Sequence, residues 1–443
     1  MPGSISESLE FSPTGAMLAE AIAELDELGS GAGGAVEREV REAALRAFLR
    51  APERTVFPAG LEWSSGRARV PVLPRATAGR PPEGLDVPAL AVENAGGLVH
   101  LGSTYLDPLE AAGDPRVTLV ALADARRSAR ERVDDVHLHV VAPATDRFTA
   151  LATAFQNCGA YVDVPDGVSL DAPLQLIWMS RPGPPSAVFP HTVIRLGAGA
   201  RATIVERHIG SAETFVAGIV EADLGPGARL DYVAIQQTDD GAHIFVQRRA
   251  RCAPDAVVAW HVADLGGARV RSVCGAQLTG ARAAAEANAL FFARGFAQVE
   301  TVVDVDHDAP RTQSRLTVRR AATDRARGSF AGALRFAPQA TRCVATMRDD
   351  GLILSPNAYL DAAPVLAVPS HHVWASHASN VGSLDEEELF YVQSRGITRA
   401  VAERMMALAF FEPAIARFPT DAVRDEVRTA LDAHLDDVPD TFA

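Results

Sequence analysis

The chain contains no lysine, so all 42 of its basic residues are arginine. A phosphate-binding P-loop needs a lysine ammonium, and a Schiff-base or pyridoxal phosphate enzyme needs a lysine amine. Both kinds of site are therefore excluded, and any ATP chemistry must come from another subunit. Genomic base composition explains the bias itself, because arginine serves on exposed faces much as lysine does.

Cysteine is scarce and scattered. Cys158, Cys252, Cys274 and Cys343 form no CxxC pair. This spacing excludes a closed zinc or cluster site made by one chain, and it argues against a disulfide framework. Each cysteine is interpreted first as a small buried hydrophobe.

Long apolar runs and excess positive charge are also missing. There is no run of 18 apolar residues and no basic, apolar N-terminal leader, so neither membrane insertion nor secretion is predicted and the cytoplasm is expected. A formal net charge of −14 argues against nucleic acid and anionic membranes as partners.

The motifs of familiar catalytic sites are absent as well. No GxSxG, HExxH or EF-hand loop occurs. Gly197 and Gly199 open a strand pattern rather than a helix, so they are not a dinucleotide-binding fingerprint. The sequence predicts a globular protein that is not an enzyme on its own.

The middle third of the chain repeats. The segment Arg195 to His208 returns 28 residues later as Asp223 to Gln236, then more faintly as Arg251 to Asp264, and Leu278 to Phe292 continues the series. Each unit has a Gly/Pro turn, a strand of alternating apolar residues, a second turn and another strand. This pattern predicts a right-handed parallel β-helix, with Gly or Asn where the coil turns through positive φ. A β-sandwich or jelly roll is the alternative, because both also use short strands with Gly-rich turns.

Three regions are expected along the chain: a helical and irregular part over residues 1–120, the β-helix core over 121–376, and a helical domain over 377–443. In the first region, apolar spacing predicts helices at Ala16 to Leu28 and Val36 to Leu49, and a strand at Leu98 to Leu101. The two helices are separated by the glycine-rich linker Gly29 to Gly34.

Two helices are predicted near the C-terminus. Ser383 is the expected N-cap of a helix from Leu384 to Ser394, followed by Gly396 as the left-handed residue after its end. Thr398 is the expected N-cap of a second helix, Arg399 to Phe411. Their amphipathic spacing predicts a helical hairpin.

The end of this region resembles a known family. The run SHASNVGSLDEEELFYVQSRGI, from Ser376 to Ile397, is similar to the C-terminal signature of SufD, in the SufB/SufD family of iron–sulfur cluster assembly proteins. Ala289 to Pro310, Asp324 to Phe336 and Leu352 to Val368 match the family's order and spacing. The middle of the chain matches loosely and the N-terminus hardly at all.

The resemblance implies a scaffold subunit with a β-helix core. It would pair edge to edge with a SufB-like scaffold and dock a SufC-like ABC ATPase, whose ATP-driven dimerisation would rearrange the interface. No stably bound cofactor is implied, only iron or a transient iron–sulfur cluster at the SufB interface. The residues expected to dock the ATPase are Leu389, Phe390, Tyr391, Arg395, Gly396, Met405 and Phe410.

Three histidines are candidates for that interface. His377 falls on the histidine of the family's corresponding segment, whereas His371 and His372 are better explained as exposed residues at a strand edge. Imidazole suits iron, copper or zinc. Many SufD proteins carry a cysteine two positions before this histidine, and the chain has Ala375 there, so thiolate would come from the partner. Cys343 lies in the family-like region and is a further candidate thiol.

A second group of possible ligands is Asp304, Asp306, His307 and Asp308. Alternating aspartates before a proline more often form an exposed strand face and a turn than a metal site, so the first interpretation is preferred. Two other functions stay open: a SufB-type or homodimeric scaffold of the same family, and a β-helical carbohydrate-active enzyme, which the 6% aromatic content disfavours.

Overall fold

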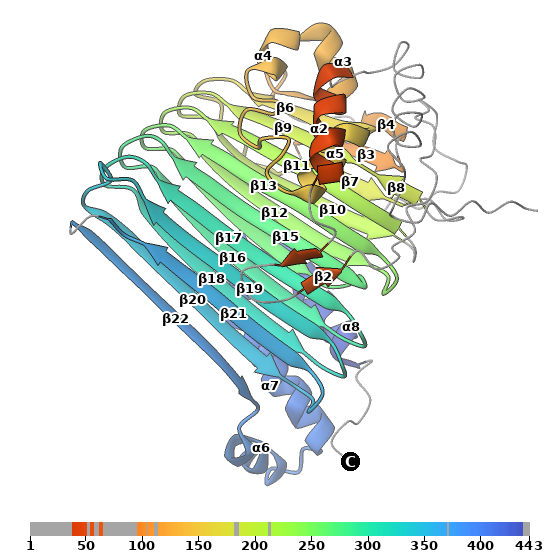
Figure 1. The fold of residues 1–443 in the computed structure, drawn as a ribbon. Coiled ribbons are helices and arrows are strands. Elements are labelled where there is room, and N and C mark those ends of the chain that lie inside the picture. The colour runs from red at the N-terminus through yellow and green to blue at the C-terminus, as the bar shows by residue number, and fades with distance from the viewer. Residues whose placement is uncertain are drawn as a thin grey trace, which may run out of the picture.

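The computed structural model describes residues 38–50, 54–56, 62–64, 95–102, 104–109, 114–180, 186–210, 214–369 and 372–436. The helix expected at Ala16 to Leu28, the linker Gly29 to Gly34 and His371 lie outside these residues. The described part is a β-helix with helices at both ends of the chain (Figure 1).

Two ten-stranded sheets form the β-helix, and each is named here by its terminal strand. The order in the β22 sheet is β22 (Val373–Ser383), β20 (Cys343–Ile353), β18 (Gln313–Ala322), β16 (Ala284–Ala293), β14 (Val257–Asp264), β12 (Arg229–Thr238), β10 (Arg201–Gly210), β7 (Leu174–Met179), β3 (Gly96–Leu101) and β4 (Thr104–Leu109). The order in the β21 sheet is β21 (Tyr359–Ala367), β19 (Arg327–Phe336), β17 (Gln298–His307), β15 (Arg269–Leu278), β13 (His243–Cys252), β11 (Thr214–Leu224), β9 (Pro190–Leu196), β6 (Cys158–Val164) and β5 (Thr118–Ala121), with β8 (Ser186–Val188) beside β11.

The sequence repeat is one turn of this coil. From β9 onward, consecutive strands alternate between the two sheets, and the neighbours within each sheet are parallel. Arg201 of β10 pairs with Arg229 of β12, which is the 28-residue spacing seen in the sequence. The parallel β-helix is therefore confirmed, and the β-sandwich alternative is wrong. The predicted strand at Leu98 to Leu101 is also confirmed, as part of β3.

One corner of the coil turns through left-handed residues. Successive turns of the chain place Gly199, Gly227, Asp255, Arg282, Arg311 and Arg342 there, with φ between 59° and 68°. We call this column the αL corner. The backbone N–H of each of these residues donates to a carbonyl of the next turn, as from Arg311 to Thr341 at 2.8 Å. The expectation of Gly or Asn is correct for the first two positions only; Asp and Arg occupy the other four.

The interior of the coil is apolar and tightly filled. Side chains alternate inward and outward along each strand, and the inward rows of neighbouring turns stack. Tyr232, Trp260 and Phe330 are each at most 1% exposed within this core. Burying one large apolar side chain contributes about 1.5–3 kcal/mol, so repetition over many turns holds the β-helix together.

Helices near the N-terminus cover the strands of the β21 sheet that come first in the chain. The predicted helix at Val36 to Leu49 is observed as α2 (Arg38–Arg50), which packs on α5 (Arg147–Phe155). Arg41 ties them by donating to the carbonyls of Ala154 and Gln156, at 3.1 and 3.0 Å. The remaining elements of this region are β1 (Arg54–Val56), β2 (Glu62–Ser64), α3 (Leu122–Ser128) and α4 (Arg130–Asp134).

Three helices follow the last strand, where two were predicted: α6 (Glu386–Gln393), α7 (Arg399–Ile415) and α8 (Asp421–Asp436). Asp385 caps α6, accepting from the N–H groups of Glu387 and Glu388 at 2.8 and 3.2 Å. The expected cap, Ser383, is wrong because that residue still pairs with Ile353 as the end of β22. Gly396 is left-handed as predicted, with φ of 86°.

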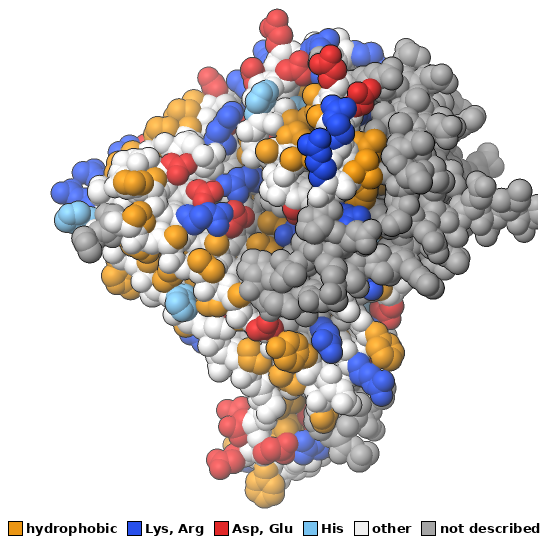
Figure 2. Space-filling model, viewed as in Figure 1, with side chains coloured by type: hydrophobic (Ala, Val, Ile, Leu, Met, Phe, Trp, Pro, Cys, Tyr) orange, Lys and Arg blue, Asp and Glu red, His pale blue; other side chains and the backbone are white. Residues whose placement is uncertain are grey.

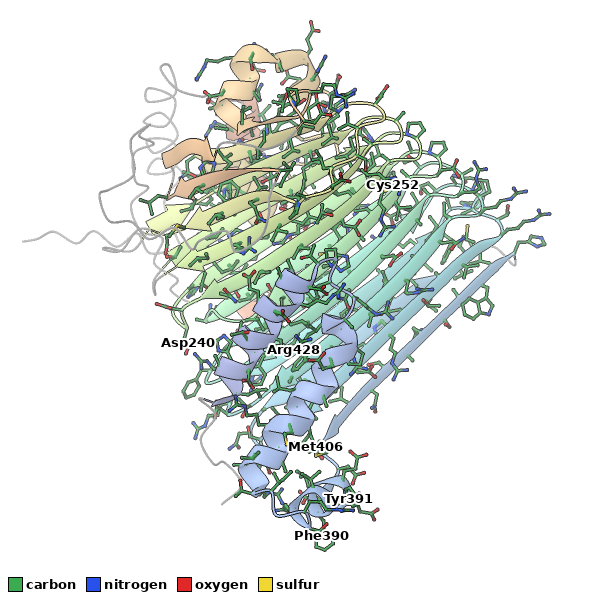
Figure 3. The ribbon with its side chains drawn as sticks, turned by 180° about the vertical axis from the view of Figure 1, so that it is seen from behind. Asp240, Cys252, Phe390, Tyr391, Met406 and Arg428 are labelled. Atoms are coloured by element: carbon green, nitrogen blue, oxygen red, sulfur yellow. The ribbon has the colours of Figure 1, made fainter. Side chains whose placement is uncertain are left out.

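The helices α7 and α8 lie against the outer face of the β22 sheet (Figure 3). Phe411, Phe418 and Val427 are buried in this contact. Arg207 of β10 forms a bidentate ion pair with Glu426 of α8, with Nε 2.9 Å from Oε1 and Nη2 2.7 Å from Oε2. The amide of Asn288 donates to the carbonyl of Ala414 at 2.9 Å. Of the three C-terminal helices described, α6 and the start of α7 project beyond the sheets (Figure 1).

Candidate functional site

The β-helix is open at its C-terminal end. Within the described residues β21 and β22 each have one strand neighbour, so their outer edges present unpaired N–H and C=O groups (Figure 1). Apolar side chains are also exposed there. Those that are 39–58% exposed on the last turns are Val344, Tyr359, Val365, Val368, Trp374 and Val381. A β-helix end of this kind has the backbone groups and the apolar side chains that contact with another chain requires.

His377 lies in the middle of β22, on the row of side chains that faces the interior. Its partner in β20 is Met347, which is buried in the core. His377 is nevertheless exposed, because no further turn among the described residues covers it. The strand spans the expected domain boundary at residue 377, since it continues to Ser383. The second histidine, His372, is also exposed, and its carbonyl accepts the N–H of Arg342 at 2.6 Å.

A buried ion pair anchors the last turn. Arg320 of β18 and Asp349 of β20 are 0% and 1% exposed, and the guanidinium Nε and Nη2 lie 2.6 and 2.5 Å from the two carboxylate oxygens. Ser379 of β22 donates to Asp349 at 2.9 Å, while Arg320 also donates to the carbonyl of Asp361 in β21 at 2.6 Å. Burial raises the pKa of Asp349, with Arg320 and Ser379 acting in the opposite direction.

Sequence analysis did not find this pair. Arg320 and Asp349 are 29 residues apart and meet diagonally across neighbouring strands, because the register sets Arg320 beside Gly351 and Asp349 beside Val318. The signal was present in the repeat, but it becomes visible only when the strand register is known. The pair fixes both terminal strands and so holds the row that carries His377.

Cys343 does not share a surface with His377. The thiol is buried, 1% exposed, and its Sγ accepts from the Thr312 hydroxyl at 3.1 Å. Thr312 also lies 2.8 Å from Nδ1 of the buried His307. Cys343 pairs with Val373, four residues before His377, which separates the two positions by roughly 13 Å along the strand.

The aspartates of β17 form ion pairs with arginines. Asp304 lies 2.8 Å from Arg249 and 2.7 Å from Arg335, and Asp306 lies 2.7 Å from Arg335. His307 points inward, where burial lowers its pKa to about 4. The aspartates therefore lie on the outer strand face, as preferred, but that face is only partly exposed because the arginines cover it. Among the described residues, no three His, Cys, Asp or Glu side chains are grouped to hold a metal ion.

The projecting helices carry a second exposed surface, made of Phe390, Tyr391, Val401 and Met405. We call it the α6–α7 patch. Their exposed fractions are 72%, 61%, 49% and 48%, and Phe390 and Tyr391 lie at the far tip, away from the sheets (Figure 3). Arg395 donates to the Tyr391 hydroxyl at 3.0 Å and stacks on its ring at 5.1 Å.

Two residues expected on the docking surface lie elsewhere. Leu389 is 1% exposed and faces inward from α6. Phe410 is half-buried against the contact between the helices and the sheet, where the Arg319 guanidinium stacks on its ring at 4.9 Å. Both residues hold the helices in place rather than forming exposed contacts. Acidic side chains accompany the hydrophobic ones at the projecting end (Figure 2); exposed Glu386, Glu387 and Glu388 open α6.

These features define a class of protein: a β-helix with an open strand edge and with projecting helices that expose apolar side chains. Residues 178–410 match the family described as "SUF system FeS cluster assembly, SufBD core domain". The chain belongs to this SufB/SufD family of iron–sulfur cluster assembly scaffolds, and it is SufD-like.

Characterised relatives agree with this assignment. The chain is 25% identical over 321 residues to the iron–sulfur cluster assembly protein SufD of Bacillus subtilis, covering 71% of this chain and 73% of that protein. It is 30% identical over 301 residues to a SufBD family protein of Mycobacterium bovis, covering 66% and 75%. With SufD of Escherichia coli the identity is 28% over 233 residues, covering 52% and 54%. None of the described helices is long and apolar enough to cross a membrane.

Proposed function

We propose that the chain is a SufD-like subunit that pairs with a SufB-like scaffold through its open end and docks a SufC-like ABC ATPase through the α6–α7 patch. It positions its partners for cluster assembly in the cytoplasm, and those partners supply ATP hydrolysis and thiolate ligands. The single observation that carries the proposal is the open end, where two unpaired strand edges, exposed apolar side chains and His377 occur together.

Strand addition is the natural way to cover such an end. The edges of β21 and β22 offer backbone donors and acceptors that a second β-helix satisfies by continuing the two sheets. Burying Trp374 and its apolar neighbours would add the hydrophobic contribution that an isolated edge lacks. A partner of the same fold matches both requirements.

His377 is then positioned as a supporting ligand. Once a partner covers the end, its imidazole faces the seam between the two β-helices, where iron or a nascent cluster is the cargo rather than a resident cofactor. Imidazole binds iron in its neutral form. Because Ala375 replaces the family's cysteine and Cys343 is buried, the soft ligands have to come from the partner.

Copurification tests the proposal directly. Tagged chain, purified anaerobically from its own organism, is expected to retain a SufC-like ATPase and a SufB-like chain in a stable complex, identified by mass spectrometry and native mass. Recovery of the chain without either protein would contradict the proposal. A complex containing two copies of this chain and the ATPase, but no SufB-like chain, would support the homodimeric scaffold instead.

His377→Ala is expected to lower the cluster yield of that complex without altering its composition, because it removes a ligand at the seam but no strand hydrogen bond. The yield is measured by absorption spectroscopy after anaerobic reconstitution with iron and sulfide. His372→Ala, which changes an exposed histidine outside the interior-facing row, is the control. Equal yields from both variants would make His377 a structural residue.

A further inference from the structure

The αL corner changes from small and acidic residues to arginine as it approaches the open end. Gly199, Gly227 and Asp255 come first, and Arg282, Arg311 and Arg342 follow on the last turns. The three arginines are exposed, and their backbone φ is 59–64°, a conformation that residues with a Cβ rarely adopt. Arginine and histidine side chains gather at the tip where β22 begins (Figure 2).

One pair of side chains within the αL corner shows how a carboxylate binds there. Asp255 and Arg282 occupy neighbouring turns, and their side chains form a bidentate pair, with Nε and Nη2 of Arg282 2.6 and 2.5 Å from the two carboxylate oxygens. Side chains from successive turns therefore meet at this corner. A carboxylate lying beside the next arginines would be bound by the same planar fork.

Arg311 and Arg342 have no such partner. Neither forms an ion pair or a side-chain hydrogen bond with any residue that the structure describes. The spacing of neighbouring strands places the two positions about 4.8 Å apart, so two like charges stand side by side. A side chain fits at this corner, since a Cβ added at Gly199 or Gly227 has nothing within 4 Å, but the left-handed φ favours glycine over any residue with a Cβ. The fold alone thus gives no reason for arginine.

We propose that Arg311 and Arg342 bind a carboxylate of the chain that covers the open end, and so select an acidic partner. The inference rests on the proposed function. Arg342 is one turn from the edge, because its N–H donates to the carbonyl of His372 just before β22. The internal Asp255–Arg282 pair identifies the bound group as a carboxylate. Two arginines on a chain of net charge −14 do not make a nucleic-acid surface.

Glycine substitution separates folding from binding. Arg311→Gly with Arg342→Gly is expected to leave the thermal midpoint unchanged or higher, because it relieves the left-handed backbone, and to slow association with the SufB-like chain at least tenfold at low salt. Association is measured by surface plasmon resonance over a range of ionic strength. Arg311→Lys with Arg342→Lys keeps the charge and should retain most of the rate and its salt dependence.

The control removes two arginines elsewhere. Arg50→Gln with Arg201→Gln makes the same change in net charge at exposed positions away from the open end and should associate as the unsubstituted chain does. Equal rates for the control and the glycine variant would overturn the carboxylate site while leaving the proposed pairing intact. If the unsubstituted chain fails to bind the SufB-like chain, the proposed function and this inference both fail.

Discussion

Asp349→Asn should lower the free energy of unfolding by about 3–5 kcal/mol, because it leaves the Arg320 guanidinium buried without its counter-charge. The guanidinium is 0% exposed, so water cannot replace the lost carboxylate without opening the last turns of the β-helix. Urea denaturation followed by circular dichroism measures the change. The loss should be accompanied by faster amide exchange in β21 and β22, which the pair connects through Asp361 and Ser379.

Two further variants show whether burial is the cause. Asp255→Asn removes the same kind of bidentate partner from Arg282 at an exposed corner, and it should change stability far less than Asp349→Asn does, because water solvates both groups. Replacing both buried partners, by Arg320→Met with Asp349→Leu, should recover most of the loss, since no charge is left unpaired. A similar, small effect of both single substitutions would show that the Arg320–Asp349 pair does not anchor the end.

Phe390→Asp combined with Tyr391→Asp should abolish capture of the SufC-like ATPase. Aromatic side chains that fill a partner's pocket commonly contribute about 2 kcal/mol or more each, so losing two lowers the affinity by roughly a thousandfold. Both side chains are mostly exposed, which means that the fold should be unaffected. Isothermal titration calorimetry with purified ATPase measures the affinity, and the thermal midpoint reports on folding.

Phe296→Asp is the matched control, because Phe296 is 77% exposed in a turn of the β-helix, away from the α6–α7 patch. It should bind the ATPase as the unsubstituted chain does. Phe410→Asp would be a poor test, since it places a charge in the contact between the helices and the sheet. Normal affinity of the Phe390 and Tyr391 variant would place the docking surface elsewhere on the molecule.

The fold could be predicted because its repeat is local and regular. The 28-residue spacing from Arg195 to Asp223 is the length of one turn, and each turn buries the same alternating row, so sequence similarity and strand register coincide. Helix caps were less predictable. Ser383 and Asp385 both suit an N-cap, and pairing of Ser383 with Ile353 decides between them. That pairing is a tertiary contact, which local sequence does not contain.

The candidate site could be predicted only in part. The family resemblance singled out His377 in the sequence, but its exposure follows from its place on β22, beyond which the described residues form no further turn. The Arg320–Asp349 pair and the unpaired Arg311 and Arg342 arise from the stacking of residues 29 to 31 positions apart. Such columns appear only when each turn's length is known. Burial of Leu389 likewise depends on neighbouring elements, whereas burial of Cys343 agrees with the first interpretation of the sequence.

The short connection between β22 and α6 has a mechanical consequence. Only Leu384 and Asp385 separate the strand that carries His377 from the helix at the tip. A two-residue connection cannot lengthen, so a shift of α6 by a few ångströms would also move the end of β22. A protein bound at Phe390 would thus change the position of the β22 edge, and a partner bound at that edge would in turn change the affinity at Phe390.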